Sequence, residues 1–166
     1  MTDKDQIIKE KLSHSGYFDF SALYSYAHTW FKNEGYGVNE EKYAEKVKGN
    51  AREINIEWKA TKTVSDYFKI EHSIKFEIKD LTEVEAEIEG KKKKMNKGSV
   101  DIEIKGVLIK DYESKWESSP FNKFMRDVYN KYIIPTRVGS MEGKVESDAK
   151  AFKEEMKAFL ELTGRR

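Results

Sequence analysis

The stretch YFKIEHSIKFEIK, residues Tyr67 to Lys79, decides the fold. Its apolar side chains recur at every second position, and charged or small polar side chains occupy the positions between them. That period of two predicts a long β-strand with one dry face and one wet face. His72 lies at the centre of the dry face and is the only ionisable side chain there.

The segments around this stretch alternate in the same way and predict an antiparallel meander. Gly49-Asn50 and Ser65-Asp66 suit tight turns, and a bulge at Gly106 would bring Val107 and Ile109 into phase with the preceding strand positions. A frayed start and a break at Ser15-Gly16 flank a short first strand. The predicted strands cover residues 7–13, 43–48, 52–63, 67–79, 83–89 and 99–111.

Three helices complete the pattern. Asp19 is a suitable N-cap for a helix with a broad aromatic face that ends at Gly35. Ser119-Pro120 predicts the start of a second helix, which Pro135 ends. An apolar stripe at helical spacing predicts a final helix over residues 140–162.

Strands followed by helices indicate one α+β domain of 166 residues. We expect a curved antiparallel sheet of five to six strands, with the N-terminal helix and the two C-terminal helices packed on one face. This element order resembles the helix-grip fold of START-related lipid- and ligand-binding proteins, in which a curved sheet wraps a long C-terminal helix. The family usually has one more strand and a single final helix, so the chain departs from it at both points.

Composition excludes several kinds of chemistry. The chain has no cysteine, which excludes disulfides, thiol catalysis and cysteine-based metal sites. Lysine plus arginine number 31 and aspartate plus glutamate 30, so the basic excess of a dedicated nucleic-acid-binding protein is absent, and sequence-specific nucleic-acid binding is not expected. The sequence has neither an apolar run of about 20 residues nor a signal core, which predicts a cytoplasmic protein that does not span a membrane.

Known catalytic and cofactor motifs do not occur in the sequence. It contains no phosphate-binding glycine loop, no HExxH and no GxSxG, and the three histidines are not spaced to share a metal. We therefore expect no cofactor and no metal, and the absence of a catalytic motif favours a non-enzymatic role.

His72 is the sharpest candidate for a functional residue, as a general base or a ligand anchor facing a cavity. Tyr129 or Tyr132 on a facing helix would complete a polar cluster. The plainer alternative is a core histidine satisfied by one hydrogen bond. If a cavity exists between sheet and helices, we expect its lining to be Trp58, His72, Ile74, Phe124, Val128 and Tyr132.

A second candidate site is the predicted hairpin tip, residues 90–98. Its cations would contact phosphate in RNA or in anionic lipid headgroups without sequence specificity. The alternative is a solvated turn whose lysines discourage edge aggregation, since four glutamates flank the tip and no aromatic side chain interleaves with it. The cations are Lys91, Lys92, Lys93, Lys94 and Lys97.

The sequence thus favours a non-enzymatic binding module, whose concave face either holds an apolar small molecule between sheet and helices or is filled by the chain's own side chains. A structural or assembly subunit that acts through protein–protein contacts, including a homo-oligomer, is the first alternative. Electrostatic contact through the lysine tip is the second.

Overall fold

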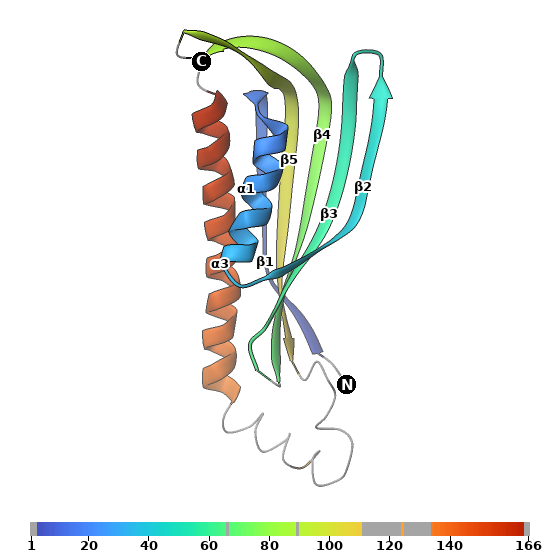
Figure 1. The fold of residues 1–166 in the computed structure, drawn as a ribbon. Coiled ribbons are helices and arrows are strands. Elements are labelled where there is room, and N and C mark those ends of the chain that lie inside the picture. Colours follow the sequence, from blue (N-terminus) through green and yellow to red (C-terminus); the bar gives the residue numbers. More distant parts are fainter. Residues whose placement is uncertain (1–2, 66, 89, 111–123, 125–133, 165–166) are drawn as a thin grey trace.

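Five antiparallel strands form one curved sheet, in the spatial order β1-β5-β4-β3-β2 (Figure 1). The computed structural model describes residues 3–65, 67–88, 90–110, 124 and 134–164. The α+β class and the antiparallel sheet predicted from the sequence are confirmed. The elements are β1 (Asp3–Phe18), α1 (Phe20–Asn33), β2 (Gly37–Lys48), β3 (Ala51–Thr63), β4 (Phe68–Ile88), β5 (Lys91–Lys110) and α3 (Ile134–Gly164).

Helices α1 and α3 both lie on one face of the sheet (Figure 1), which we call the inner face. The dry side of the opening stretch faces them, because the even-numbered residues from Phe68 to Ile78 are all buried. Equivalent positions of β3 and β5 continue the same layer, and α3 contributes its apolar stripe. The stripe of α3 consists of Val145, Ala149, Phe152, Met156 and Leu160.

Helix α1 begins and ends where its sequence predicts. The Asp19 side chain accepts a hydrogen bond from the Ala22 amide at 3.1 Å and so caps the first turn. Gly35 follows the last turn with a φ of 88°, a left-handed conformation that glycine adopts without strain. The Lys62 ammonium donates to the Glu34 carbonyl at 3.1 Å and joins this helix end to β3.

The two strands predicted at 67–79 and 83–89 are one strand, β4. Its register with β5 shifts between Lys79 and Thr82, where Asp80 has a φ of 55°. Such a bulge bends a strand without ending it, so the pairing resumes and runs to Ile88. The hairpin tip predicted at residues 90–98 is therefore also wrong, because Lys91 to Lys94 already belong to β5.

The bulge predicted at Gly106 is also wrong. The even-numbered phase of β5 passes through Gly106 to Leu108, which is fully buried, so no shift is needed there. The irregularity lies instead in β1, where Ile7 is an extra residue opposite Gly106 and Val107. Strand β1 is longer than predicted, because it starts at Asp3 and passes through Ser15 and Gly16 without a break.

The final helix starts earlier than its apolar stripe predicts. The structure describes it from Ile134 onward, so Pro135, which was predicted to end the preceding helix, lies within α3. The predicted helix over 120–135 lies outside the described residues, apart from Phe124, which is helical, and the start of α3. Among the helices that the structure describes, none is long and apolar enough to cross a membrane.

Candidate functional site

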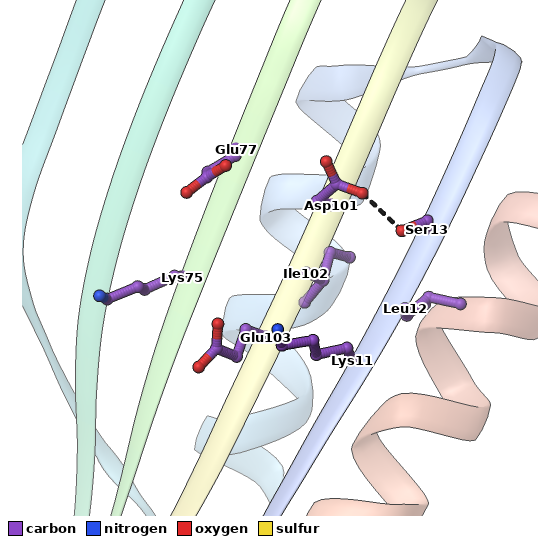
Figure 2. A pocket seen from close by; sticks show the side chains of 8 residues that line it. All are labelled: Lys11, Leu12, Ser13, Lys75, Glu77, Asp101, Ile102 and Glu103. Carbon is purple, nitrogen blue, oxygen red and sulfur yellow. Dashed lines mark hydrogen bonds between the residues drawn. The ribbon is translucent and has the colours of Figure 1, made fainter.

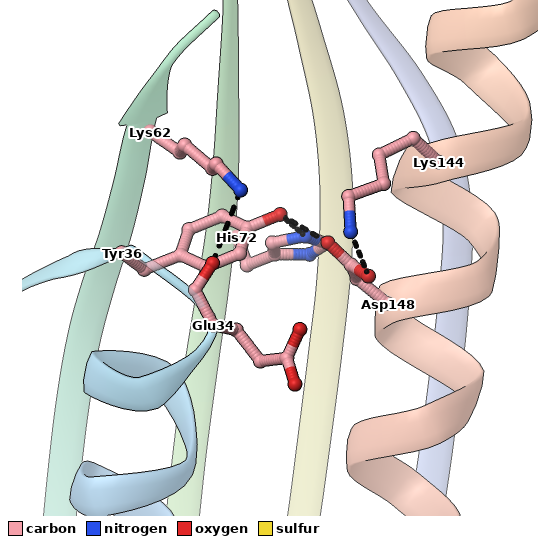
Figure 3. Close-up of polar contacts among 6 residues, drawn as sticks. All are labelled: Glu34, Tyr36, Lys62, His72, Lys144 and Asp148. Carbon is pink, nitrogen blue, oxygen red and sulfur yellow. Dashed lines mark hydrogen bonds and ion pairs between the residues drawn. The ribbon is translucent and has the colours of Figure 1, made fainter.

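A polar cluster lies between sheet and helix in the otherwise apolar inner layer (Figure 3). His72 reaches it from near the start of β4, Tyr36 from the connection between α1 and β2, and Asp148 from α3. The Tyr36 hydroxyl donates to Oδ2 of Asp148 at 2.6 Å and lies 3.2 Å from Nε2 of His72. Lys144 Nζ, one turn earlier on α3, lies 3.0 Å from Oδ1 of Asp148. We call these four residues the relay.

The relay determines which nitrogen of His72 carries its proton. Because the Tyr36 hydrogen is used on Asp148, Nε2 of His72 must donate to the Tyr36 oxygen. In a neutral imidazole the other nitrogen, Nδ1, is then an acceptor. Nδ1 is buried and has no hydrogen-bond partner in the described structure. The contacts between neighbouring members of the relay are therefore all made, but Nδ1 of His72, at the buried end, is an acceptor without a donor.

Burial controls the charge states in the relay. The pKa of His72 is lowered to about 4, chiefly because burial disfavours the imidazolium; Lys144 lowers it further and Asp148 opposes the shift. The pKa of Tyr36 is raised by burial and by its hydrogen bond to the Asp148 carboxylate. At neutral pH, His72 is therefore uncharged and Tyr36 is protonated. The pair can accept and donate hydrogen bonds, but neither group is a strong base or a nucleophile.

The relay is open to solvent at one end only. His72 is 0% exposed and the Asp148 side chain 7%, whereas the Lys144 side chain is 40% exposed. The ammonium can thus remain hydrated while it offsets the buried carboxylate, which lowers the cost of burying that charge.

Gly106 brings the helix close to His72. This glycine is paired with His72 across β4 and β5. A Cβ atom at Gly106 would lie 2.5 Å from Cγ1 of Val145 and 3.2 Å from Cε1 of His72. The absence of a side chain therefore lets α3 and the imidazole share the space above β5.

Three of the six predicted cavity residues lie together on the inner face. Trp58 and Ile74 are cross-strand partners, and His72 lies two residues before Ile74 on the same face of β4. All three side chains are at most 1% exposed. The Trp58 ring contacts Tyr24 and Phe76, and its Nε1 donates to Glu40 at 3.1 Å. Phe124 is 59% exposed. Val128, Tyr129 and Tyr132 lie outside the described residues.

The predicted lysine tip forms a cross-strand ladder with glutamates. Lys92 lies opposite Glu87 and Lys94 opposite Glu85, so the register alternates their charges. The Lys97 ammonium lies 5.5 Å from the centre of the Tyr17 ring on β1. Lys91, Lys92, Lys94 and Lys97 are exposed.

A hollow lies on the other face of the sheet, which we call the outer face (Figure 2). It measures about 350 Å³, and charged side chains dominate its lining. Ser13 donates to Asp101, and Lys75 and Glu103 belong to the same lining. Three further hollows in the described part of the structure also lack His72 in their walls.

Three members of the relay, Tyr36, Lys144 and Asp148, were not identified from the sequence. Asp148 lies three residues after Val145 and four before Phe152, so a carboxylate interrupts the buried stripe of α3. That interruption is a signal equivalent to the histidine on the dry face of β4. Tyr36 stands between two glycines in a connection, and no periodicity marks it as buried.

Within the described residues, no group of three or more histidine, aspartate or glutamate side chains is placed to hold a metal ion. Comparison of the chain with protein-family models, with curated proteins and with solved structures finds no match, so the geometry of the site carries the argument about function.

Proposed function

We propose that this chain is a non-enzymatic binding module that takes up a small, largely apolar molecule between the sheet and α3. The molecule donates one hydrogen bond to Nδ1 of His72. The observation that carries this proposal is the buried, unpartnered Nδ1 at the inner end of an otherwise satisfied relay. A buried acceptor without a partner costs about 1–3 kcal/mol, and a ligand that donates to it recovers that cost.

The arrangement of the elements supports the same proposal. A long final helix along the inner face of a curved antiparallel sheet supports the resemblance to START-related lipid- and ligand-binding proteins, in which a curved sheet wraps such a helix. The ligand of this proposal lies between the sheet and that helix. The likeness concerns fold alone, so it supports a place for the ligand and leaves its chemistry to the residues at that place.

Binding requires α3 to move, because the inner face beneath it is closely packed. Trp30 and Phe31 of α1 pack against Phe152 of α3, with ring centres 5.5 and 4.7 Å apart. Polar contacts at the rim, Lys153 with Glu10 and Tyr26 with Glu155, hold the helix in place. Surface contacts of this kind are individually weak, so a ligand with sufficient apolar surface can displace the helix.

A pair of matched probes tests the proposal. 1-Octanol can donate a hydrogen bond and octyl methyl ether cannot, although both carry the same apolar chain. We expect octanol to shift the ¹⁵N resonance of His72 Nδ1 and the amide signals of α3, and the ether to leave the imidazole signal unchanged. The chain has three histidines, so the signal can be assigned by substitution.

His72→Phe is the control, because it fills the same place without an acceptor. Its α3 amide signals should not respond to octanol at the concentration that affects the unmodified chain. Equal responses of both proteins, or no response of the unmodified chain at octanol saturation, would contradict the proposal.

Contact with RNA or anionic lipid through the lysines of β5 has weaker support. Lys92 and Lys94 lie opposite Glu87 and Glu85, and this pairing reduces the local positive charge that a phosphate would meet.

A further inference from the structure

Strand β2 is an open edge of the sheet. It pairs with β3 on one side, and on its other side the described residues provide no strand. Every residue from Asn39 to Lys48 is exposed. Its unpaired backbone N–H and C=O groups can therefore accept another extended segment.

The side chains of this edge differ between the two faces. On the outer face, Lys42 and Lys46 lie opposite Glu57 and Glu53 of β3. These carboxylates make their ion pairs with other lysines, at 3.8 Å with Lys75 and at 3.6 Å with Lys48. Within the described part of the chain, Lys42 and Lys46 make no ion pair.

On the inner face of the same edge, two apolar side chains are exposed. Tyr43 is 46% and Val47 66% exposed, and both project to the side on which the buried residues of β3 lie. Glu45 lies between them, and its carboxylate is paired with Arg52 at 3.1 Å. The inner row therefore presents apolar surface with its one acid already neutralised.

These two rows specify the chemistry of a partner. We propose that β2 binds an extended peptide segment in which acidic residues alternate with apolar ones, added as a sixth strand beside Lys42–Lys48. The acids of such a segment face Lys42 and Lys46, and its apolar side chains cover Tyr43 and Val47. The bulge between Glu40 and Lys42 ends the regular ladder, which limits the segment to about seven residues.

The chain itself contains a strand pairing that matches the acidic row of this proposal. Residues Thr82 to Ile88 alternate glutamate with apolar side chains, and they pair with the lysine-bearing start of β5. There Glu85 lies opposite Lys94, and Glu87 opposite Lys92. A lysine-bearing strand of this protein thus already has an acidic and apolar strand as its neighbour.

The test uses the intact chain and a labelled peptide of sequence TEVEAEIE, which copies residues 82–89. Fluorescence anisotropy measures its binding, and amide chemical shifts locate it. We expect saturable binding with shifts confined to β2 and its neighbour β3. Raising the salt concentration should weaken binding, because exposed charge pairs are screened.

Two protein variants separate the edges of the sheet. The double variant Lys42→Ser with Lys46→Ser should bind the peptide roughly five- to tenfold more weakly, since it loses two exposed charge contacts. The matched control, Lys9→Ser with Lys11→Ser, removes two cations from β1 at the opposite edge and should bind as the unmodified chain does. Both pairs of lysines are at the surface, and circular dichroism verifies that the variants fold.

Two peptide variants test the mode of binding. A peptide with lysine in place of each glutamate should not bind. The original peptide with alternate amides N-methylated loses main-chain hydrogen bonding along one edge and should also fail to bind. Shifts that map to β1 or β5, binding of the N-methylated peptide at full strength, or no binding of the original peptide would overturn the proposal.

Discussion

The two faces of the sheet both carry polar groups, and these groups differ in number and in setting. The outer face has many cross-strand ion pairs, such as Lys75 with Glu57 at 3.8 Å and Lys9 with Glu103 at 3.5 Å, whose side chains are partly exposed. The described inner face has one relay, in which His72 and Asp148 are buried. When one partner of an ion pair on the outer face is lost, water can solvate the other. Water cannot do the same for His72, which is fully buried.

This difference teaches where substitutions matter. An exposed ion pair contributes under about 1 kcal/mol, since water solvates either charge when its partner is lost. A buried polar group without a partner costs about 1–3 kcal/mol. The relay therefore fixes the place of α3 over β4 and, in the part of the chain that the structure describes, contains a buried acceptor without a partner, Nδ1 of His72, whereas the outer face tolerates change.

The largest effect is expected from acid, which should lower the free energy of unfolding through His72 on the inner face. Burial lowers the pKa of His72 to about 4, whereas the unfolded chain has the ordinary value of 6.5. The unfolded chain therefore binds more protons, and the free energy of unfolding falls by roughly 3 kcal/mol as the pH falls from 6.5 to 4. Above pH 6.5 the pH dependence from this group fades, and it is nearly gone about one pH unit higher. Denaturant unfolding at several pH values measures the slope.

His72→Phe is the control for this slope, because other carboxylates also titrate in acid. The difference in unfolding free energy between the two proteins should change with pH between 6.5 and 4 and level off above it. A constant difference across the whole range would show that His72 is not held neutral by burial.

Gly106→Ala should have the next largest effect. The new methyl group would lie 2.5 Å from Cγ1 of Val145 and 3.0 Å from Cγ2 of Ile8, so α3 or β1 must shift. Over-packing of this kind costs about 2 kcal/mol, measured as a lower midpoint of chemical unfolding. Gly139→Ala is the matched control within α3, where nothing lies within 4 Å; it should leave stability unchanged or raise it. Equal effects of both changes would contradict close packing at Gly106.

Tyr36→Phe should destabilise the chain by about 1.5 kcal/mol, because the change leaves both Nε2 of His72 and Oδ2 of Asp148 without their shared partner. Tyr26→Phe also removes a hydroxyl bonded to a carboxylate, that of Glu155, but at a site where Tyr26 is 38% exposed. Its effect on the free energy of unfolding should be clearly smaller. If the two losses are the same, burial does not distinguish the relay from the surface.

Lys75→Gln should give the smallest effect, under about 1 kcal/mol, because its pair with Glu57 is exposed to water. The effect should shrink further as the salt concentration rises toward about 1 M. Thermal unfolding at low and high salt measures it. A larger loss that persists in high salt would mean that the outer face contributes more than solvated pairs can.

The sequence was a good guide where one period dominates. The alternation in β3 and in the first part of β4 predicted strands whose inner positions are buried, and Asp19 and Gly35 predicted the limits of α1. The predictions failed where two features compete. Two separate strands were predicted on either side of residues 80–82, but a bulge joins them into one strand, and a bulge was predicted at Gly106, whose role is instead close contact with Val145.

The candidate site could be predicted only in part. His72 was recognisable because a titratable group interrupts an apolar face, and Asp148 carries the same signal on α3. Which groups meet depends on how α3 lies across the sheet, and local periodicity does not contain that information. Tyr36 could not be found because its burial results from tertiary packing around a short connection.

The pairing of β1 with β5 also has a consequence for biosynthesis. Strand β1 leaves the ribosome before the other strands of this sheet and is the last of them to find its neighbour, because its partners in β5 begin at Asn96 and end at Lys110. The hairpins from β2 to β5 can form in order as they emerge, whereas β1 must wait for most of the chain to be made. Closure of this edge is a contact between distant parts of the chain, and such contacts slow folding. A nascent chain halted before residue 96 should therefore keep β1 accessible to chaperones and proteases.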